Sequence, residues 1–450
     1  MQLIDLINHT RLGCENSPVD ENLNARSEFK RDFDRIIFSP AFRRLQGKTQ
    51  IFPFPHNDHT HNRLTHSLEV FCLGRTLGTI AANKIEKSLA SDIGDIVGAA
   101  SLAHDIGNPP FGHSGEEAFS NYFKELDPKL MNFLPDEMQR TDLTNFEGNA
   151  IGFRVLTHSK PLFKKDKGGY GLTYSTLASY LKYPTNSSSI KKKYEKSASL
   201  KKNSFLSPEL PLVKKILNDF KVKERKEKNS WYRFPLAFLV EAADDIAYHI
   251  IDLEDGYRNK LISYSDVENY LKKLIGKLEK KDSKVFSNIT DKSQKIAFLR
   301  SKAINSILLE VSEIFFKKWD SIANYDYDNQ LIREIPKASV LEDIYDFSSE
   351  HLYNSKAVVQ VELAGYKIIF DLLDIFIDSF LLNPNSHFSK KVKRLIPEEY
   401  FIISKGKLKN EKYTGFELIL NICEYIFGMT DNFALHLYRK LKGIELPEFN

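Results

Sequence analysis

Cysteine is scarce in this 450-residue chain, and its scarcity excludes one class of architecture. The three cysteines, Cys14, Cys72 and Cys423, are widely spaced and odd in number, whereas disulfide-stabilised proteins carry dense, paired cysteines. This usage is typical of a reducing compartment without a disulfide framework. The first residues, MQLIDLINHTRLGCENS, include Asp5 and no long apolar run, so they do not have the pattern of a signal peptide. We therefore expect a cytoplasmic protein.

The chain also lacks a strong net charge and the common glycine-rich nucleotide-binding loops. The formal net charge is +4, with 28% charged and 42% hydrophobic residues, and the mean hydropathy is -0.36. These values are typical of a globular protein and are too weakly basic to imply nucleic-acid binding by themselves. Neither GxxxxGKS/T nor GxGxxG occurs, so any nucleotide must be bound in a different way.

Long hydrophobic runs are missing except in the segment VELAGYKIIFDLLDIFIDSFLL. Within it, Lys367, Asp371, Asp374 and Asp378 recur at helical spacing and form one polar stripe on an otherwise apolar helix. A membrane span requires about 20 predominantly apolar residues. The charged stripe favours a buried amphipathic helix, and we expect no membrane association.

The chain is rich in helical periodicity, and no sustained alternation typical of strands appears. Apolar residues at helical spacing therefore predict an all-α fold with core-facing helices. The stripes that mark four of these helices are Phe33, Ile36, Ile37, Ala41, Phe42 and Leu45 for the first, His66, Val70, Leu73 and Leu77 for the second, Val97, Ala100, Ala103 and His104 for the third, and Ala237, Val240, Asp244 and Tyr248 for the fourth.

Side chains that bind metal ions lie on or beside these stripes. His104 and Asp105 stand together in SLAHDIGNPPFGHSGEEAF, with His66 upstream and Asp244 downstream. Each alone is equally well explained as a satisfied core residue, but the buried carboxylates together would require cationic or metal partners. Two imidazoles and two carboxylates balance a dication and favour Mn, Fe, Co, Ni or Mg over a closed zinc site. We predict one divalent ion held by His66, His104, Asp105 and Asp244.

A second group of histidines precedes this site in HNDHTHNRLTH. His56, His59 and His61 are as dense as a metal-binding tract, but their spacing does not keep them on one helix face with His66. We expect His56 and His61 to be loop residues and leave His59 open.

The adjacent carboxylates Asp244 and Asp245 also require a choice. Asp244 is followed at four and eight residues by Tyr248 and Asp252, which places the three on one helical stripe. We therefore expect Asp245 to point elsewhere.

Between about residues 160 and 230 the helical pattern gives way to a lysine-rich stretch. Its densest parts are KPLFKKDKGGYG, PTNSSSIKKKYEKSASLKKNSF and KVKERKEKNSW. The simplest interpretation is a solvated loop with short helices. The functional alternative is that a few of these lysines reach a polyanionic substrate.

Several longer segments carry a resemblance to a known family. In chain order they are RDFDRIIFSPAFRRLQGKTQIFP, NRLTHSLEV, HDIGNPPFGHSGEEAF, NFEGNAIGFRVL, EAADDIAYHIIDLED, VELAGYKII and GMTDNFALHLY. They resemble successive blocks of the deoxyguanosine triphosphate triphosphohydrolases, within the HD-domain phosphohydrolase superfamily. The resemblance implies an HD-domain helical core with an additional C-terminal helical region. Residues 1–260 would form an N-terminal arm and the catalytic core, with the insertion at about 160–230, and residues 261–450 would pack on it as the C-terminal helical region.

The resemblance also implies a reaction. Such enzymes cut between the 5'-oxygen and the α-phosphorus of a deoxynucleoside triphosphate (dNTP), releasing a deoxynucleoside and inorganic triphosphate. An alkoxide is a poor leaving group, so protonation of the 5'-oxygen accelerates this cut by orders of magnitude. By resemblance His113 is placed for that step, and Glu116 orients its imidazole. Whether His113 acts as acid, base or nucleophile stays open.

Substrate contacts follow from the same resemblance. Tyr248 would close on deoxyribose and leave no room for a 2'-hydroxyl, while Asp252 would accept a hydrogen bond from the 3'-hydroxyl. Arg63 resembles the arginine that meets a phosphate. Four further contacts are expected, for each of which a surface or packing role is the alternative: Gln46 to the sugar or base, and Asn149, Lys182 and Tyr183 elsewhere on the substrate.

One block departs from the family, in which TD is often followed by Arg-Tyr. Here the sequence is Thr430, Asp431, Asn432 and Phe433, so the base or inter-subunit contacts of that arginine, and a strict preference for guanine, stay open. dGTP is nevertheless the expected substrate. The resemblance also implies a homo-oligomer with C-terminal helices near neighbouring active sites, and single-stranded nucleic acid or a dNTP as an effector.

Two other functions compete with this interpretation. One is another HD-type nucleotide phosphohydrolase, such as a nucleoside 5'-monophosphatase or a cyclic-nucleotide or alarmone hydrolase. The other is a non-catalytic nucleotide or nucleic-acid sensor, whose affinity would come from the lysine-rich stretch. The presence of His113 and Glu116 argues against the sensor, because a protein that only binds needs no proton-transfer group.

Overall fold

The computed structural model describes residues 1–15, 26–52, 60–125, 127–158, 169–190, 197–398, 400 and 414–446. Within these ranges the chain is helical, and the only β-pairing consists of isolated bridges. The predicted all-α fold class is therefore confirmed. The α-helices are α1 (Glu28–Ile37), α2 (Pro40–Arg44), α3 (Arg63–Ile85), α4 (Ala90–Ala103), α5 (Gly112–Lys124), α6 (Glu137–Thr144), α7 (Gly148–Thr157), α8 (Tyr174–Tyr180), α9 (Leu210–Asp219), α10 (Ala237–Arg258), α11 (Tyr264–Ile275), α12 (Lys280–Asn288), α13 (Lys292–Ala323), α14 (Ala338–Ser348), α15 (Lys356–Ile377), α16 (His387–Val392), α18 (Gly415–Phe427) and α19 (Asp431–Leu441).

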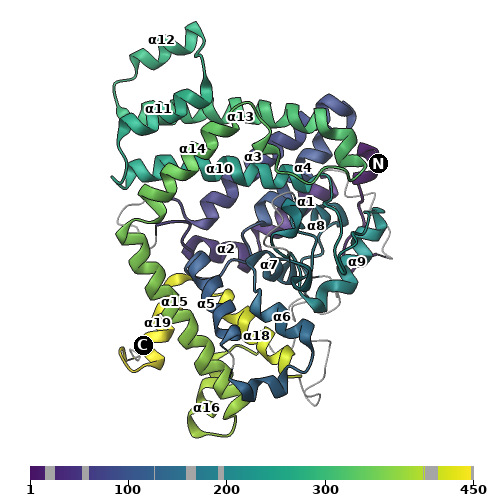
Figure 1. Cartoon of the computed structure of the whole chain (residues 1–450), viewed down its shortest axis with the longest axis vertical. Helices are drawn as coiled ribbons and strands as arrows, with labels where there is room; N and C mark the ends of the chain where they lie inside the picture. Colours follow the sequence, from purple (N-terminus) through teal and green to yellow (C-terminus); the bar gives the residue numbers. More distant parts are fainter. Residues whose placement is uncertain are drawn as a thin grey trace.

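The centre of the molecule is the hairpin formed by α3 and α4, with α10 packed against both helices (Figure 1). The two helices of the hairpin approach closely, because a Cβ atom at Gly78 would lie only 2.9 Å from the carbonyl oxygen of Ile93. A hairpin brings the beginning of its first helix beside the end of its second. This geometry places His66, in the first turn of α3, next to His104, which caps the end of α4.

The predicted first helix is wrong in one respect, because it is two helices. α1 ends at Ile37 and α2 begins at Pro40. Proline has no N–H to donate and is favoured at the first position of a helix. The Ser39 hydroxyl accepts a hydrogen bond from the Phe42 N–H, 3.1 Å away, and caps the new helix. The other three predicted stripes lie on α3, on α4 with its C-cap, and on α10.

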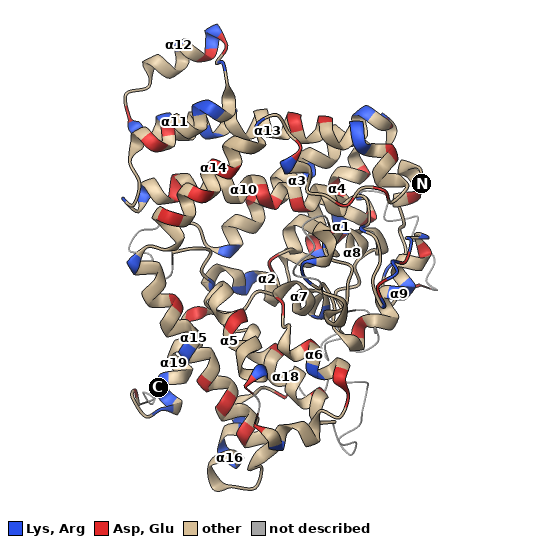
Figure 2. Ribbon diagram, in the orientation of Figure 1, with Lys and Arg blue, Asp and Glu red and all other residues tan. Residues whose placement is uncertain are grey.

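Helices after residue 260 pack on the core at two places. α13 lies against α3 and α10, whereas α15 lies against α5, α18 and α19, in the lower half of Figure 1. α15 is the predicted amphipathic helix, and its Asp371 pairs with Lys367 at 2.7 Å and with Lys442 at 3.0 Å. No helix in the described ranges is long and apolar enough to cross a membrane. Figure 2 shows acidic and basic residues intermixed along the helices, in keeping with the small net charge.

The lysine-rich stretch is more ordered than its sequence predicts. Its described parts contain α8, α9 and short 3-10 turns, so the expected short helices are present. However, every residue of α8 is buried, and Lys182, just after that helix, is only 7% exposed. Much of this stretch is therefore part of the core rather than a solvated loop.

Candidate active site

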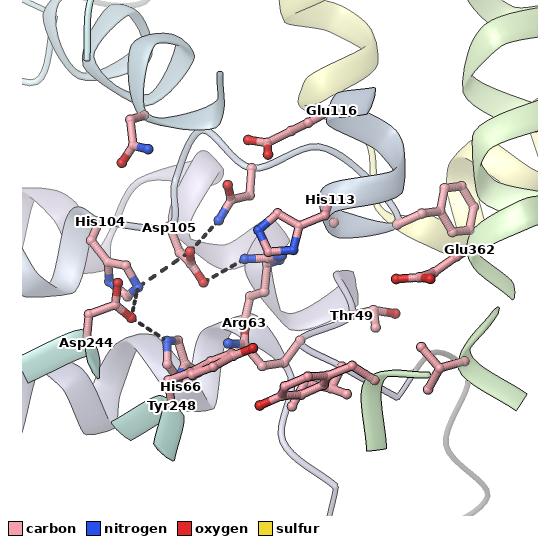
Figure 3. A pocket seen from close by; sticks show the side chains of 18 of the residues that line it. Thr49, Arg63, His66, His104, Asp105, His113, Glu116, Asp244, Tyr248 and Glu362 are labelled. Carbon is pink, nitrogen blue, oxygen red and sulfur yellow. Dashed lines mark hydrogen bonds and ion pairs between the residues drawn. The ribbon is translucent and has the colours of Figure 1, made fainter. Parts of the chain in front are cut away.

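A cavity of about 470 Å³ lies between the α3–α4–α10 core and the segment that joins α14 to α15 (Figure 3). The core side contributes polar and charged groups. The opposite side comes from the end of α14, a turn of π-helix at Ser349–Tyr353 and the first turns of α15. The cavity brings together most of the residues predicted for a site: Arg63, His66, His104, Asp105, His113, Glu116, Asn149, Lys182, Tyr183, Asp244 and Tyr248.

Three of the four predicted metal ligands form a tight group at the base of this cavity. Ligand atoms of His66, His104 and Asp244 all lie within 4.8 Å of one another. The Asp244 Oδ1 atom is 3.2 Å from Nε2 of His66 and 3.4 Å from Nε2 of His104. The Nε2 atom of His104 is buried and has no hydrogen-bond partner among the described residues. Two imidazole nitrogens facing one carboxylate oxygen are suited to a divalent cation.

Neighbouring groups set the orientation of these ligands. The backbone carbonyl of Ser101 accepts a hydrogen bond from Nδ1 of His104 at 2.7 Å, which leaves the lone pair of Nε2 for a ligand. Lys182 donates to Oδ2 of Asp244 at 2.6 Å, so Oδ1 is the oxygen that faces the histidines. Burial alone would raise the pKa of Asp244, but Lys182 and His104 hold it well below its ordinary value. Asp244 is therefore an anion and available to a cation.

Asp105, the fourth predicted ligand, stands at the edge of the group. Its Oδ1 atom lies 3.4 Å from Nε2 of His104 and also accepts a hydrogen bond from the Asn108 side chain. Its Oδ2 atom is 3.0 Å from Nη1 of Arg63. Burial would raise the pKa of Asp105, but Arg63 and His104 lower it, so this carboxylate is also charged.

Asp245 points away from the metal-ligand group, as its position on α10 predicts. It lines a second cavity of about 520 Å³ together with His249 and Arg333, and Tyr248 lies between the two cavities because it lines both. Burial and the nearby Glu241 and Asp244 carboxylates raise the pKa of Asp245 well above its ordinary value.

His113 and Glu116 lie in the first turns of α5, immediately after the predicted glycine- and proline-rich loop. Both line the cavity (Figure 3). The Glu116 carboxylate accepts a hydrogen bond from the Gly148 N–H at 2.6 Å, which fixes it against α7. Burial lowers the pKa of His113, and the negative charge of Glu116 opposes that shift. The lowered pKa favours the neutral form of the His113 ring in the free protein.

Two predicted substrate contacts lie away from the cavity wall. Gln46 is exposed on a 3-10 turn (Leu45–Gly47), and Thr49 and Gln50 line the cavity from the same segment. Asp252 is 3% exposed and accepts a hydrogen bond from the Tyr353 hydroxyl at 2.8 Å. Sugar or base contacts by Gln46 and Asp252 therefore stay predictions.

Some cavity residues were not predicted from the sequence. Lys202 lines the cavity and pairs with Glu147 at 3.0 Å, but nothing in its lysine-rich surroundings distinguishes it from its neighbours. Tyr353 stacks on Tyr248 with ring centroids 5.4 Å apart. Glu362 is the second residue of the VELAGY block, so the sequence pointed to this segment but assigned no role to the residue.

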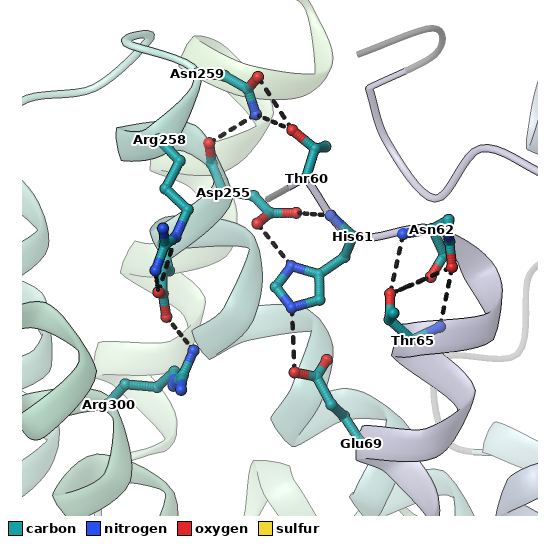
Figure 4. A network of polar contacts seen from close by, with 10 residues as sticks. Thr60, His61, Asn62, Thr65, Glu69, Asp255, Arg258, Asn259 and Arg300 are labelled. Carbon is teal, nitrogen blue, oxygen red and sulfur yellow. Dashed lines mark hydrogen bonds and ion pairs between the residues drawn. The ribbon is translucent and has the colours of Figure 1, made fainter. Parts of the chain in front are cut away.

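His61 belongs to a network that joins the start of α3 to the end of α10 (Figure 4). As expected, it lies in the loop before α3, while His56 and His59 lie outside the described residues. Its Nδ1 atom is 2.7 Å from Asp255 and its Nε2 atom is 3.1 Å from Glu69. The next residue, Asn62, caps α3, the helix that carries Arg63 and His66. Burial alone would lower the pKa of His61, but hydrogen bonds to Asp255 and Glu69 raise it to about 10.

The raised pKa of His61 predicts a pH dependence of stability. Its ordinary value is 6.5 and its value in the folded protein is about 10. The charged form therefore stabilises the fold fully below about pH 6.5, and this contribution is lost as the pH rises through about 10. His61→Gln should reduce the free energy of unfolding by roughly 2–4 kcal/mol at pH 6 and by little above pH 10. Thermal unfolding of the wild type and of His61→Gln across this pH range measures the difference in stability. His387→Gln, at an exposed histidine, is the control. A difference that is the same at every pH would contradict the ionic role.

A family model matches part of the chain. Residues 63–138 match the family model described as the HD domain, a segment that contains three of the four predicted metal ligands. The fold and the site thus define an HD-domain protein.

Relatives that align over nearly the whole chain identify the family within the HD-domain proteins. The chain is 35% identical over 457 residues to a deoxyguanosinetriphosphate triphosphohydrolase-like protein of Synechocystis sp., an alignment that covers 99% of this chain and 100% of the relative. A protein of the same name from Pseudomonas aeruginosa is 35% identical over 452 residues, with 98% and 99% covered, and one from Listeria monocytogenes is 30% identical over 458 residues, with 94% and 96% covered. The chain belongs to the family of deoxyguanosinetriphosphate triphosphohydrolase-like proteins, and it is a hydrolase.

Proposed function

We propose that this protein is a metal-dependent dNTP triphosphohydrolase, which converts a dNTP to a deoxynucleoside and inorganic triphosphate. One observation carries the proposal. A single cavity holds the His66, His104 and Asp244 group, the His113 imidazole, and three cationic side chains. Together these can bind a cation, a polyphosphate and a leaving oxygen.

The metal would be held by His66, His104 and Asp244, with Asp105 beside them. When bound, a divalent ion at such a site polarises a phosphoryl oxygen and lowers the pKa of a coordinated water. The mixed nitrogen and oxygen ligands suit Mn, Mg, Fe, Co or Ni. The second carboxylate oxygen of Asp244 is already occupied by Lys182, which keeps the first turned toward the histidines.

The cationic side chains favour a polyanionic substrate. Arg63, Lys182 and Lys202 all line the cavity. Arg63 and Lys182 also neutralise the carboxylates at positions 105 and 244. A triphosphate would compete for these donors, and the planar guanidinium of Arg63 can bind a phosphate through two hydrogen bonds.

His113 is proposed to transfer a proton at the 5'-oxygen. Burial keeps its pKa low in the free protein, but a bound triphosphate brings negative charge next to the ring and raises the pKa again. The ring would then hold a proton when the substrate is in place. Glu116, three residues further along α5, supports the positive form of the ring.

The stacked rings of Tyr248 and Tyr353 are proposed to form the wall against deoxyribose. Tyr248→Ala should weaken dNTP binding and reduce the preference for a dNTP over the matching ribonucleotide by roughly tenfold, because the space denied to a 2'-hydroxyl is opened. Steady-state kinetics with dGTP and GTP give the two kcat/KM values. The control is Tyr270→Ala on α11, outside the cavity. An unchanged deoxy-to-ribo ratio would remove the steric role of Tyr248.

A panel of substrates tests the reaction. Each dNTP and NTP, dGTP first, is incubated with the protein and Mn or Mg, and the products are separated by ion-exchange chromatography. We expect triphosphate and deoxynucleoside from dNTPs. Monophosphate with pyrophosphate, or stepwise orthophosphate, would refute the proposal. Adding single-stranded DNA or a second dNTP to the same assay tests the expected effectors.

The partner proposed for the C-terminal helices is a second copy of this chain. Leu363 on α15 is 68% exposed and Phe433 on α19 is 50% exposed, and Leu363 follows Glu362, which lines the cavity. Covering these apolar side chains with a second copy would remove them from water, which favours association. Light scattering with and without metal and dNTP measures the mass of the protein in solution. A fully active monomer of 52 kDa in both conditions would refute the proposed homo-oligomer.

A further inference from the structure

The backbone just before His113 has an unusual conformation. Phe111 has φ 61° and ψ 19°, in the left-handed region, and Gly112 follows with φ 59°. Glycine adopts such angles readily, but phenylalanine does so at an energetic cost. Phe111 is also the N-cap of α5 and supplies no side-chain cap to it. The turn that points His113 into the cavity therefore depends on contacts from elsewhere in the fold.

Asp431, from the first turn of α19, supplies the most direct of these contacts. Its side chain is 3% exposed. Its Oδ1 atom accepts the Phe111 N–H at 3.0 Å, and its Oδ2 atom accepts the Thr49 N–H at 2.9 Å and also the Thr49 hydroxyl. Thr49 itself lines the cavity. One buried carboxylate thus joins the C-terminal helix, the cavity wall and the strained turn.

Two other contacts hold the same turn. Phe111 packs on Gly365 of α15 so closely that a Cβ atom there would lie 2.5 Å from Cβ of Phe111. Lys48, 3% exposed, donates to the carbonyl oxygens of Asn108 and Phe427, each at 2.6 Å. The loop between α4 and α5 is therefore held by residues from both α15 and the α18–α19 region.

We propose that Asp431 is a positioning residue for His113, because its carboxylate holds Phe111 in the left-handed conformation that aims the first turn of α5 into the cavity. This inference rests on the proposed role of His113 in proton transfer. The C-terminal helix α19 would then act on the active site of its own subunit, through Asp431. It also explains a requirement for a carboxylate, since three donors converge on Asp431 and only an acceptor on both oxygens satisfies them.

Asp431→Asn tests this requirement with little change in shape. The amide nitrogen cannot accept a hydrogen bond, so either Phe111 or Thr49 loses its partner. We expect kcat to fall roughly 10- to 100-fold, while KM changes by less than about twofold and metal content stays at the wild-type level, because neither the ligands nor the cationic side chains move. The pH profile of kcat should also shift, since the surroundings of His113 change.

Asp371→Asn is the matched control. Asp371 is also buried, at 7% exposure, and its pair with Lys442 joins α15 to the end of α19 without touching the turn. This variant should leave kcat within about twofold of wild type, and the unfolding temperatures of both variants are measured so that a loss of kcat can be compared with a loss of stability. If Asp431→Asn fails to fold, Gly365→Ala replaces it, because the added methyl group would lie 2.5 Å from Cβ of Phe111 and displace that residue, which should give the same loss of kcat.

Two readouts separate this inference from the proposed reaction. If wild type releases triphosphate but Asp431→Asn, or Gly365→Ala in its place, keeps its kcat and pH profile, Asp431 is only a structural residue and the inference is overturned. If wild type releases no triphosphate, the proposed reaction fails. The His113 ring is then followed by NMR of 15N-histidine-labelled protein, assigned with His113→Gln. A shifted ring resonance in Asp431→Asn and an unchanged one in Asp371→Asn support positioning, whereas equal spectra overturn it.

Discussion

Replacing Asp244 by alanine should abolish metal binding and turnover together. Asp244 is the only carboxylate in the tight group with His66 and His104 among the described residues, and its pKa is held well below its ordinary value, so the site would lose its closest anion. Metal content after dialysis against Mn, measured by mass spectrometry, should fall to background, and dNTP hydrolysis should fall below detection.

The control for Asp244 is its neighbour. Asp245→Ala should leave metal content near the wild-type level, because Asp245 lines the second cavity beyond Tyr248. Asp244→Asn serves as a second variant, because an amide oxygen can still accept the hydrogen bond of Lys182 and so limits the loss of stability. Equal metal loss in the Asp244 and Asp245 variants would mean that the wrong carboxylate was assigned.

His113→Ala should separate catalysis from binding. The ring lines the cavity beside the metal-ligand group but is not one of its members. The variant should retain its metal and its affinity for dNTP, because Arg63, Lys182 and Lys202 remain. Its kcat should fall roughly 10²- to 10⁴-fold, the usual range for loss of a proton-transfer group.

Binding of dNTP to His113→Ala is measured by calorimetry with Ca in place of a catalytic metal, and kcat is measured with Mn. The control is His387→Gln, an exposed histidine at the start of α16, which should behave as wild type. A fall in metal occupancy in His113→Ala would make His113 a ligand, and the proposed mechanism would have to be rewritten.

The sequence predicts the grouping of His66, His104 and Asp244 better than it predicts the rest of the cavity, for a physical reason. His66, His104 and Asp244 lie on stripes of regular helices, where spacing alone gives direction. The loop between α4 and α5 was equally predictable, because its glycines and prolines end a helix. The break between α1 and α2 was also encoded, in Ser39 and Pro40, but the apolar periodicity continued through it and concealed the signal.

The distant wall of the cavity could not be predicted in this way. Tyr353 and Glu362 reach the cavity only because the segment from α14 to α15 lines its far side, a tertiary arrangement that leaves no local pattern. Lys202 is one lysine among many, and only the fold selects it. For Asp252 the spacing correctly predicted the stripe with Asp244, yet the side chain is covered by the Tyr353 hydroxyl, which no spacing rule reveals.

Hydrolysis of dGTP in water enriched in 18O locates the bond that is cut. With Mn present, the products are analysed by 31P NMR and mass spectrometry. Attack of water at the α-phosphorus with departure of the 5'-oxygen predicts intact inorganic triphosphate that carries one 18O, and deoxyguanosine that carries none. Deoxyguanosine monophosphate with pyrophosphate, or 18O in the deoxynucleoside, would contradict the proposed reaction.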